Sequence, residues 1–67
     1  MINFFVNGQR YYTKDKVTIC DLLYYFEYNF SLLVVEYNDL ISGKNDWDKI
    51  IISNNDKIEI VTIVGGG

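Results

Sequence analysis

Hydrophobic and polar residues alternate in two short runs at the start of the chain. In the first run, residues 2–6, the alternation places Phe4 and Val6 on one face of a strand. The second run, residues 9–13, is rich in the tyrosine and threonine that favour strands. Asn7 and Gly8 separate the runs, and both residue types accept the positive φ angles of a type I′ turn. The chain is therefore predicted to open with a β-hairpin.

A helical period replaces the alternation after residue 18. Apolar residues recur at the spacing i, i+3, i+4, i+7 in Ile19, Leu22, Leu23 and Phe26. Thr18 precedes this run as an N-cap, and Asp21 follows at the position that completes a capping box. We expect an amphipathic helix of about ten residues that fades near Asn29 and packs its apolar face on the sheet.

The second half of the chain has the pattern of short strands separated by turns. Three apolar runs predict strands: residues 32–37, 50–52 and 57–64. Two clusters of asparagine and aspartate predict turns: residues 38–39 and 54–56. Residues 43–49 form an irregular segment with a helical turn expected around Trp47, whose indole should close the open end of the core.

The predicted order is strand, strand, helix, strand, short strand, strand. A hairpin, a crossover helix and returning strands make the β-grasp arrangement, an α+β fold with a mixed sheet of four to five strands and one helix across one face. Its first and last strands lie parallel at the centre of the sheet. An SH3-like barrel is the alternative, but it does not use such a helix. We expect one domain over residues 1–64 and a flexible glycine tail at residues 65–67.

Length and composition disfavour several classes of function. With 67 residues, 49% of them hydrophobic, the chain can form one small core but has no structure to spare for a multi-substrate active site. The net charge of −3 disfavours nucleic acid and anionic membranes, which demand a basic face. No apolar run is long enough to span a membrane, and the N-terminus lacks the pattern of a secretion signal. We therefore expect an intracellular protein that is not an enzyme.

The chain offers few residues for metal or nucleophile chemistry. It has no histidine and one cysteine, so we expect no disulfide, no metal site and no bound cofactor. Cys20 lies in the first helical turn, where a thiol pKa can fall, but its neighbours Ile19 and Leu22 favour a small packed side chain. Asp46 and Asp48 fit solvated loop charges, because a catalytic pair needs a cleft that so short a chain lacks.

The end of the chain is the candidate chemical site. From Ile60 to Gly67 no side chain is charged, so the α-carboxylate of Gly67 is the only ionised group there. Gly65, Gly66 and Gly67 carry no Cβ, and when extended they place this carboxylate roughly 10 Å beyond Val64. Such a tail could enter a narrow slot in another protein. Three terminal glycines can also be a cloning remnant or a frayed end, but their place directly after a predicted central strand favours a functional tail.

Partner binding must come mainly from the folded body, because ordering the glycines costs about 1–2 kcal/mol each in backbone entropy. The helix covers one face of the sheet and leaves the other open. If Ile58 and Ile60 belong to the core, Val61 and Ile63 face outward. Phe5 also faces outward if Phe4 and Val6 face the helix. We expect a docking cluster of Phe5, Val61 and Ile63; alternatively, Phe5 is tucked against Tyr11 or Tyr12.

The sequence resembles the ThiS family, the sulfur-carrier proteins of thiamine biosynthesis within the ubiquitin-like β-grasp superfamily. The resemblance covers nearly the whole chain and rests on these segments: Phe-Val-Asn-Gly at 5–8, Thr-Ile-Cys-Asp-Leu-Leu at 18–23, Val-Glu-Tyr-Asn at 35–38, Ile-Ser-Gly-Lys-Asn-Asp-Trp at 41–47, and the ending from Asp56 to Gly67. Many family members end in two glycines after a larger residue, whereas Gly65 makes three here. The reactive atom would still be on Gly67.

The resemblance implies a carrier role for Gly67. A ThiF-type adenylyltransferase would use ATP to adenylate its carboxylate, and a cysteine persulfide would supply the sulfur of a terminal thiocarboxylate. That sulfur would pass to a thiazole synthase of the ThiG type. The compartment would be a bacterial cytoplasm or a plastid stroma, since the abundant Ile, Asn, Tyr, Lys and Phe have A/T-rich codons typical of organelle genes. A small-subunit-like carrier of molybdopterin synthase and a ubiquitin-like modifier are the alternatives.

Overall fold

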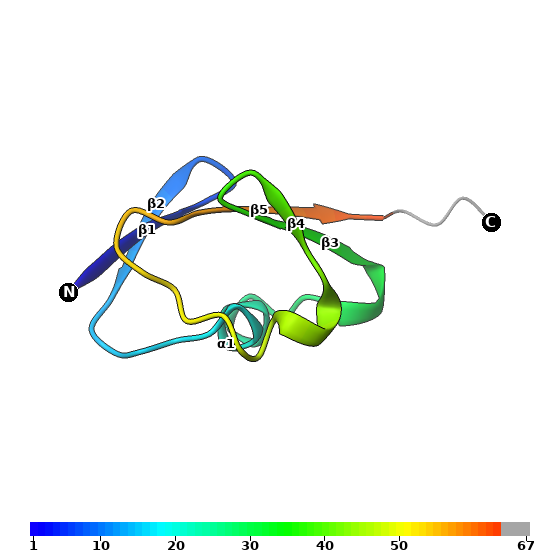
Figure 1. Cartoon of the computed structure of the whole chain (residues 1–67), viewed down its shortest axis with the longest axis horizontal. Coiled ribbons are helices and arrows are strands. Elements are labelled where there is room, and N and C mark those ends of the chain that lie inside the picture. Colours follow the sequence, from blue (N-terminus) through cyan, green and yellow to red (C-terminus); the bar gives the residue numbers. More distant parts are fainter. Residues whose placement is uncertain (64–67) are drawn as a thin grey trace.

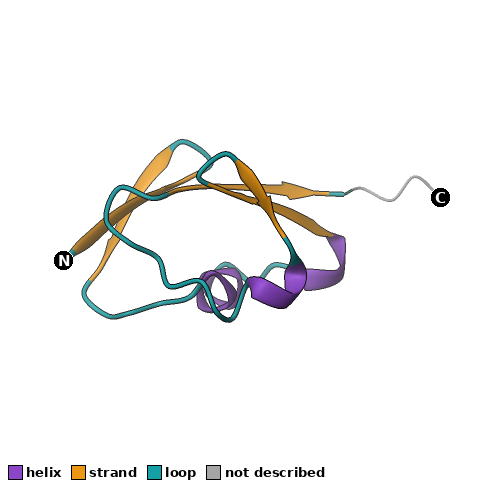
Figure 2. Ribbon diagram, viewed as in Figure 1, coloured by secondary structure: helices purple, strands orange, loops and turns teal. Residues whose placement is uncertain are grey.

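The computed structural model describes residues 1–63, which form a mixed sheet with one α-helix on one face (Figures 1 and 2). The elements are β1 (Ile2–Val6), β2 (Gln9–Thr13), α1 (Ile19–Tyr25), β3 (Leu33–Tyr37), β4 (Leu40–Ser42) and β5 (Lys57–Thr62), with 3-10 turns at Phe30–Leu32 and Lys44–Asp46. The strand order is β2-β1-β5-β3-β4. The predicted α+β β-grasp arrangement is confirmed. The division into a domain at 1–64 and a tail at 65–67 stays a prediction.

The opening hairpin forms as its sequence indicates. β1 and β2 pair antiparallel from Ile2 opposite Thr13 to Val6 opposite Gln9. Asn7 and Gly8 join them with φ angles of 49° and 81°, the positive values that this turn requires. β1 also pairs parallel with β5, so the first and last strands lie side by side inside the sheet, as predicted.

The helix begins where predicted and ends early. The Thr18 hydroxyl accepts a hydrogen bond from the Asp21 amide (3.1 Å), and the Asp21 carboxylate accepts one from the Thr18 amide (3.0 Å), which completes the capping box. The predicted continuation towards Asn29 is wrong, because α1 has seven residues and stops at Tyr25. Glu27 adopts a φ of 61°, and the amides of Glu27 and Tyr28 fold back onto the carbonyls of Tyr24 and Leu23. This is a Schellman motif without its usual glycine.

The fourth strand corrects the prediction for residues 38–52. Asn38 and Asp39 both have positive φ and form a two-residue turn that leads directly into β4, which pairs antiparallel with β3. The predicted short strand at 50–52 is wrong: its only strand-like pairing in residues 1–63 is an isolated bridge from Ile51 to Thr18. β3 begins one residue later than predicted, because Leu32 ends a 3-10 turn.

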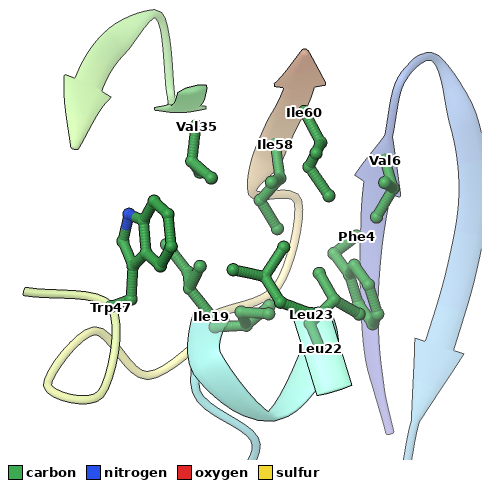
Figure 3. Close-up of a cluster of buried hydrophobic side chains, with 10 residues drawn as sticks. Phe4, Val6, Ile19, Leu22, Leu23, Val35, Trp47, Ile58 and Ile60 are labelled. Atoms are coloured by element: carbon green, nitrogen blue, oxygen red, sulfur yellow. The ribbon is translucent and has the colours of Figure 1, made fainter. Parts of the chain in front are cut away.

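The core lies between the inner face of the sheet and α1 (Figure 3). As predicted, the buried residues alternate along the strands and form one stripe along the helix. The buried hydrophobic residues are Phe4, Val6, Ile19, Leu22, Leu23, Val35, Trp47, Ile52, Ile58 and Ile60. Full burial of one such aliphatic side chain contributes about 1.5–3 kcal/mol to stability. The Trp47 indole closes the end of the core nearest β4, and its N–H donates to the Ser42 carbonyl (3.2 Å).

Candidate functional site

The predicted reactive residues Gly65, Gly66 and Gly67 lie outside the described residues. The structure therefore bears on the site through the strand that precedes them. β5 lies between β1 and β3, and it pairs with β3 along five registered positions from Tyr37 opposite Ile58 to Leu33 opposite Thr62. The Ile63 amide then donates to the Leu32 carbonyl (2.7 Å). The chain is thus hydrogen-bonded to the body as far as Ile63.

A side chain extends the pairing of β5 beyond the end of β1. The Asn7 side-chain nitrogen Nδ2 donates to the Ile60 carbonyl (3.2 Å), and the Asn7 side-chain oxygen Oδ1 accepts from the Ile60 backbone amide (2.7 Å). Asn7 therefore acts on β5 as one more strand residue would. The sequence indicated only its turn conformation, because a clamp between residues 7 and 60 depends on the parallel β1–β5 register, which no local pattern reveals.

A buried carboxylate fixes the start of β5. The Asp56 carboxylate accepts hydrogen bonds from the Tyr37 hydroxyl, the Asn38 side-chain nitrogen Nδ2 (3.1 Å) and the Ser53 backbone N–H (2.7 Å). Among the described residues, Asp56 is the one charged residue that is buried. Burial, reinforced by the hydrogen bond to Asp56 and by its charge, raises the pKa of Tyr37 to about 12. This network ties the turn at residues 53–56 to the end of β3.

The outer face of the sheet, which points away from α1, carries two of the three predicted docking residues close together. Ile58 and Ile60 are buried under the helix, whereas Val61 is 52% exposed and Ile63 is 50% exposed. The expected alternation along β5 is therefore confirmed. Val34 is the cross-strand partner of Val61 and lies on the same face. We call Val34, Val61 and Ile63 the outer-face patch.

Phe5 does not join that patch, so the expectation of one cluster is wrong. The parallel register places Phe5 opposite Lys57, four residues before Val61, which is roughly 13 Å along the strand. The Arg10 guanidinium lies over the Phe5 ring, 5.7 Å from the centroid. Alternation alone put Phe5 on the correct face, but its place along that face is set by the register.

Two carboxylates adjoin the outer-face patch, and no local sequence pattern pairs them. Glu36 on β3 and Glu59 on β5 are directly opposite each other in register, and both are half-buried. Like charges placed directly across two strands repel each other. The only ion pair among residues 1–63 joins Lys57 to Asp39 (3.0 Å), so neither glutamate has a cationic partner within the described chain. Cross-strand register was the signal needed to find this pair.

The remaining candidates show no catalytic arrangement. Cys20 is half-buried and packs against the core, and desolvation, together with the nearby Asp21 and Asp48 carboxylates, raises the pKa of its thiol. Asp46 and Asp48 are exposed, as expected of loop charges. Within residues 1–63, no three His, Cys, Asp or Glu side chains gather into a group that could hold a metal ion. In the same residues, no helix has the length and apolarity required to cross a membrane.

Comparison with protein families and curated sequences gives a consistent result. The model of the ThiS family matches residues 3–67. An uncharacterized protein ycf40 from Trieres chinensis is 66% identical over 64 residues, covering 96% of this chain and 88% of that protein. The sulfur carrier protein ThiS of Bacillus subtilis (strain 168) is 41% identical over 54 residues, covering 81% of this chain and 82% of that protein.

A solved structure has the same fold. The crystal structure of the thiamine biosynthesis protein ThiS from Geobacter metallireducens superposes with a TM-score of 0.83 and covers 98% of this chain and 100% of that one. The two sequences are 22% identical, so this likeness concerns the fold alone.

Proposed function

The chain belongs to the ThiS family, and from this membership we propose that it is a sulfur carrier of thiamine biosynthesis. The family match over residues 3–67 is the observation that carries the proposal, because it includes the glycine ending as well as the folded body. In this role the chain is a co-substrate that other enzymes load and unload, and it is not itself a catalyst.

The proposed chemistry takes place at the Gly67 carboxylate. A carboxylate oxygen attacks the α-phosphorus of ATP in a ThiF-type adenylyltransferase, which forms an acyl-adenylate and releases pyrophosphate. The terminal sulfur of a cysteine persulfide then attacks the acyl carbon, and AMP leaves. A second cysteine thiol then attacks the cysteine sulfur of the resulting acyl disulfide. The thiocarboxylate leaves, and the two cysteines are joined in a disulfide. A ThiG-type thiazole synthase takes the sulfur from the thiocarboxylate.

We propose that the loading enzyme docks on the outer-face patch. Val61 and Ile63 are exposed apolar side chains directly before the tail, so a partner bound there holds the tail near its own active site. The facing carboxylates of Glu36 and Glu59 add a negative charge beside the patch. A partner that presents a lysine or arginine at this position would relieve their repulsion, which favours a docking face with apolar and basic residues.

The names of the relatives support a plastid location. Three relatives carry the name ycf40, from Trieres chinensis, Pyropia yezoensis and Porphyra purpurea, and this name indicates plastid-encoded proteins of algae. We propose the plastid stroma as the compartment in which the chain meets its loading enzyme and thiazole synthase.

Genetic rescue tests the proposed function. A Bacillus subtilis strain lacking its ThiS protein should grow without thiamine when it expresses this chain together with its cognate loading enzyme. Deletion of Gly67 should abolish growth while leaving the melting temperature unchanged. Growth without Gly67, or no growth with the full chain although it accumulates folded, would contradict the proposal.

A matched pair of variants tests the docking face. Val61→Asp should slow thiocarboxylate formation about tenfold or more, because it puts a charge in the centre of an apolar contact beside two carboxylates. Ile51→Asp is the control, since Ile51 is 49% exposed, close to the 52% of Val61, but it forms the isolated bridge to Thr18 at the start of the helix and is remote from the tail in sequence. Equal rates for the two variants would remove the outer-face patch as the docking site.

A further inference from the structure

A second surface of the molecule has features of a binding site that the carrier role does not use. β2 is an edge strand, with β1 on one side and no strand of the described chain on the other. The backbone amides of Phe5 and Asn7 donate to the carbonyls of Asp56 and Ile58, so the residues of β1 that hydrogen-bond to β2 are the alternate ones, Phe4 among them. Arg10 and Tyr12 therefore direct their backbone N–H and C=O groups away from the sheet, and no turn or loop of residues 1–63 hydrogen-bonds to them.

An apolar groove runs beside this free edge. It has a volume of about 350 Å³ and lies between β2, the loop that leads to α1, and the helix itself; Figure 1 shows that loop joining the two layers on this side. Its walls include Tyr11 and Thr13 from β2, Val17 from the loop, and Leu22, Tyr25 and Phe26 from the helix. A strand added to β2 would place every second side chain above this groove.

The charge of the edge selects the kind of strand that fits. Arg10 lies on β2, and Lys14 and Lys16 follow directly after it; they are three of the six cations of a chain whose net charge is −3. Lys14 and Lys16 are exposed and form no ion pair within residues 1–63. Asp15 lies between the two lysines and Asp21 lies in the groove wall, where its carboxylate accepts from the Thr18 amide (3.0 Å) and keeps its charge, so over residues 10–21 three cations exceed two carboxylates by one.

These cations also argue against pairing of two copies through β2. Antiparallel β2–β2 pairing would bring the same three cations of each copy together along one edge, which costs energy. Cations on an edge strand discourage basic strands for the same reason. An acidic segment converts this repulsion into attraction.

We propose that the β2 edge and its groove bind an extended segment of another protein, with apolar residues at alternating positions and acidic residues at its flanks. The segment adds a sixth strand next to β2, hydrogen-bonds to the backbone of Arg10 and Tyr12, and inserts its apolar side chains between β2 and α1. This site is separate from the outer-face patch, and the proposal does not depend on the sulfur-carrier role.

The test uses the full chain and a defined probe, a fluorescein-labelled peptide in which isoleucine and valine alternate with threonine between two pairs of glutamates. Fluorescence anisotropy should show saturable binding, and a peptide with lysines in place of the glutamates should not bind. Hydrogen exchange of the Arg10 and Tyr12 amides should slow by about a hundredfold at a peptide concentration of one hundred times Kd. The amides of the outer-face patch should not change.

Two pairs of variants separate the groove and the charge. Tyr25→Ala should weaken binding about tenfold because Tyr25 lines the groove, whereas Tyr24→Ala, at a neighbouring exposed tyrosine that does not line it, should not. Lys14→Glu should weaken binding about fivefold, and Lys44→Glu, which changes the net charge equally, should not. Absence of binding, equal binding of both peptides, or protection of other amides would overturn the proposal. Peptide-independent protection of Arg10 and Tyr12 that grows with protein concentration would overturn it in favour of a second copy.

Discussion

At the scale of single residues, the contact between Tyr37 and Asp56 makes stability depend on pH. The pKa of Tyr37 is about 12 in the folded chain, whereas a tyrosine in an unfolded chain has a pKa of about 10. Between these values the folded state keeps a proton that the unfolded state has lost. Stability therefore keeps the full contribution of this group below about pH 10 and loses it as the pH rises towards about 12.

The measurement is urea denaturation across this range, with Tyr37→Phe as the control. The free energy of unfolding should fall with rising pH in the parent chain and fall less steeply in Tyr37→Phe. At neutral pH the variant should be less stable by about 1.5–3 kcal/mol, the usual contribution of a hydrogen bond to a charged group. Identical pH profiles for the two chains would show that the contact is not formed.

The end of α1 provides a second test with a single residue. Glu27 holds a φ of 61°, a left-handed conformation that a residue with a Cβ adopts at a cost. Glu27→Gly should raise the free energy of unfolding by about 0.5–1 kcal/mol, because relief of this cost exceeds the extra entropy of glycine in the unfolded chain. Glu27→Ala is the control for loss of the side chain. If the glycine and alanine variants are equally stable in urea, the Schellman motif is wrong.

At this scale the sequence was informative only where the residue type matches its role. Thr18, Asp21, Asn7 and Gly8 belong to residue types with strong preferences for caps and turns, so their positions were predicted. Glu27 has no such preference. It ends the helix because Phe26 and Tyr28 pack against the core on either side of it, and that tertiary packing outweighs the local cost.

At the scale of elements, the clamp from Asn7 to Ile60 holds the strand that leads to the tail. Asn7→Gly keeps the positive φ of the turn but removes both side-chain hydrogen bonds. We expect a loss of about 1–2 kcal/mol in stability. The Ile60 amide should exchange with solvent faster, while the Val61 amide, on the β3 side of β5, should change less. Hydrogen exchange followed by NMR makes this comparison, and equal acceleration along β5 would contradict a local clamp.

The elements were predictable in proportion to the length of their patterns. The hairpin and the start of the helix carry several consistent signals, and both were predicted within a residue. β4 has only three residues, two of them exposed, so it lacks an alternation of its own. The sequence signal for β4 was the two-residue turn at Asn38 and Asp39, because a turn of this length joins two strands of a hairpin directly. Residues 50–52 have a more apolar pattern, but they form a connection on the helix side of the core in which Ile52 is buried and Ile51 is exposed.

At the scale of the whole molecule, the facing carboxylates of Glu36 and Glu59 connect stability with the proposed docking. Glu59→Gln removes one carboxylate from the facing pair with Glu36 and should raise the free energy of unfolding by about 0.2–1 kcal/mol. The same variant should slow loading by the adenylyltransferase, most strongly at low salt where charge attraction is least screened. Urea denaturation and loading rates measured at two salt concentrations test both effects. A variant that is more stable and loaded equally fast would exclude the pair from docking.

The whole surface was the least predictable level. Alternation placed Phe5, Val61 and Ile63 on the open face of the sheet, but the distance between Phe5 and the others follows from the parallel β1–β5 register. The register also creates the Glu36–Glu59 pair from residues 23 positions apart. Neither follows from a local pattern, whereas the glycine ending, a feature of the chain itself, was evident from the sequence.

The central claim is that Gly67 carries sulfur, and intact mass spectrometry with alkylation tests it most directly. The Cys20→Ser variant is incubated with the loading enzyme, ATP and a persulfide donor, and then treated with iodoacetamide. Because this variant has no cysteine, only a thiocarboxylate can react, which also distinguishes sulfur transfer from oxidation of Met1. The account predicts one exchange of oxygen for sulfur and one alkyl group, both mapped to Gly67 by fragmentation. An unchanged Gly67 with active enzyme, or an isopeptide bond from Gly67 to a lysine, would contradict it.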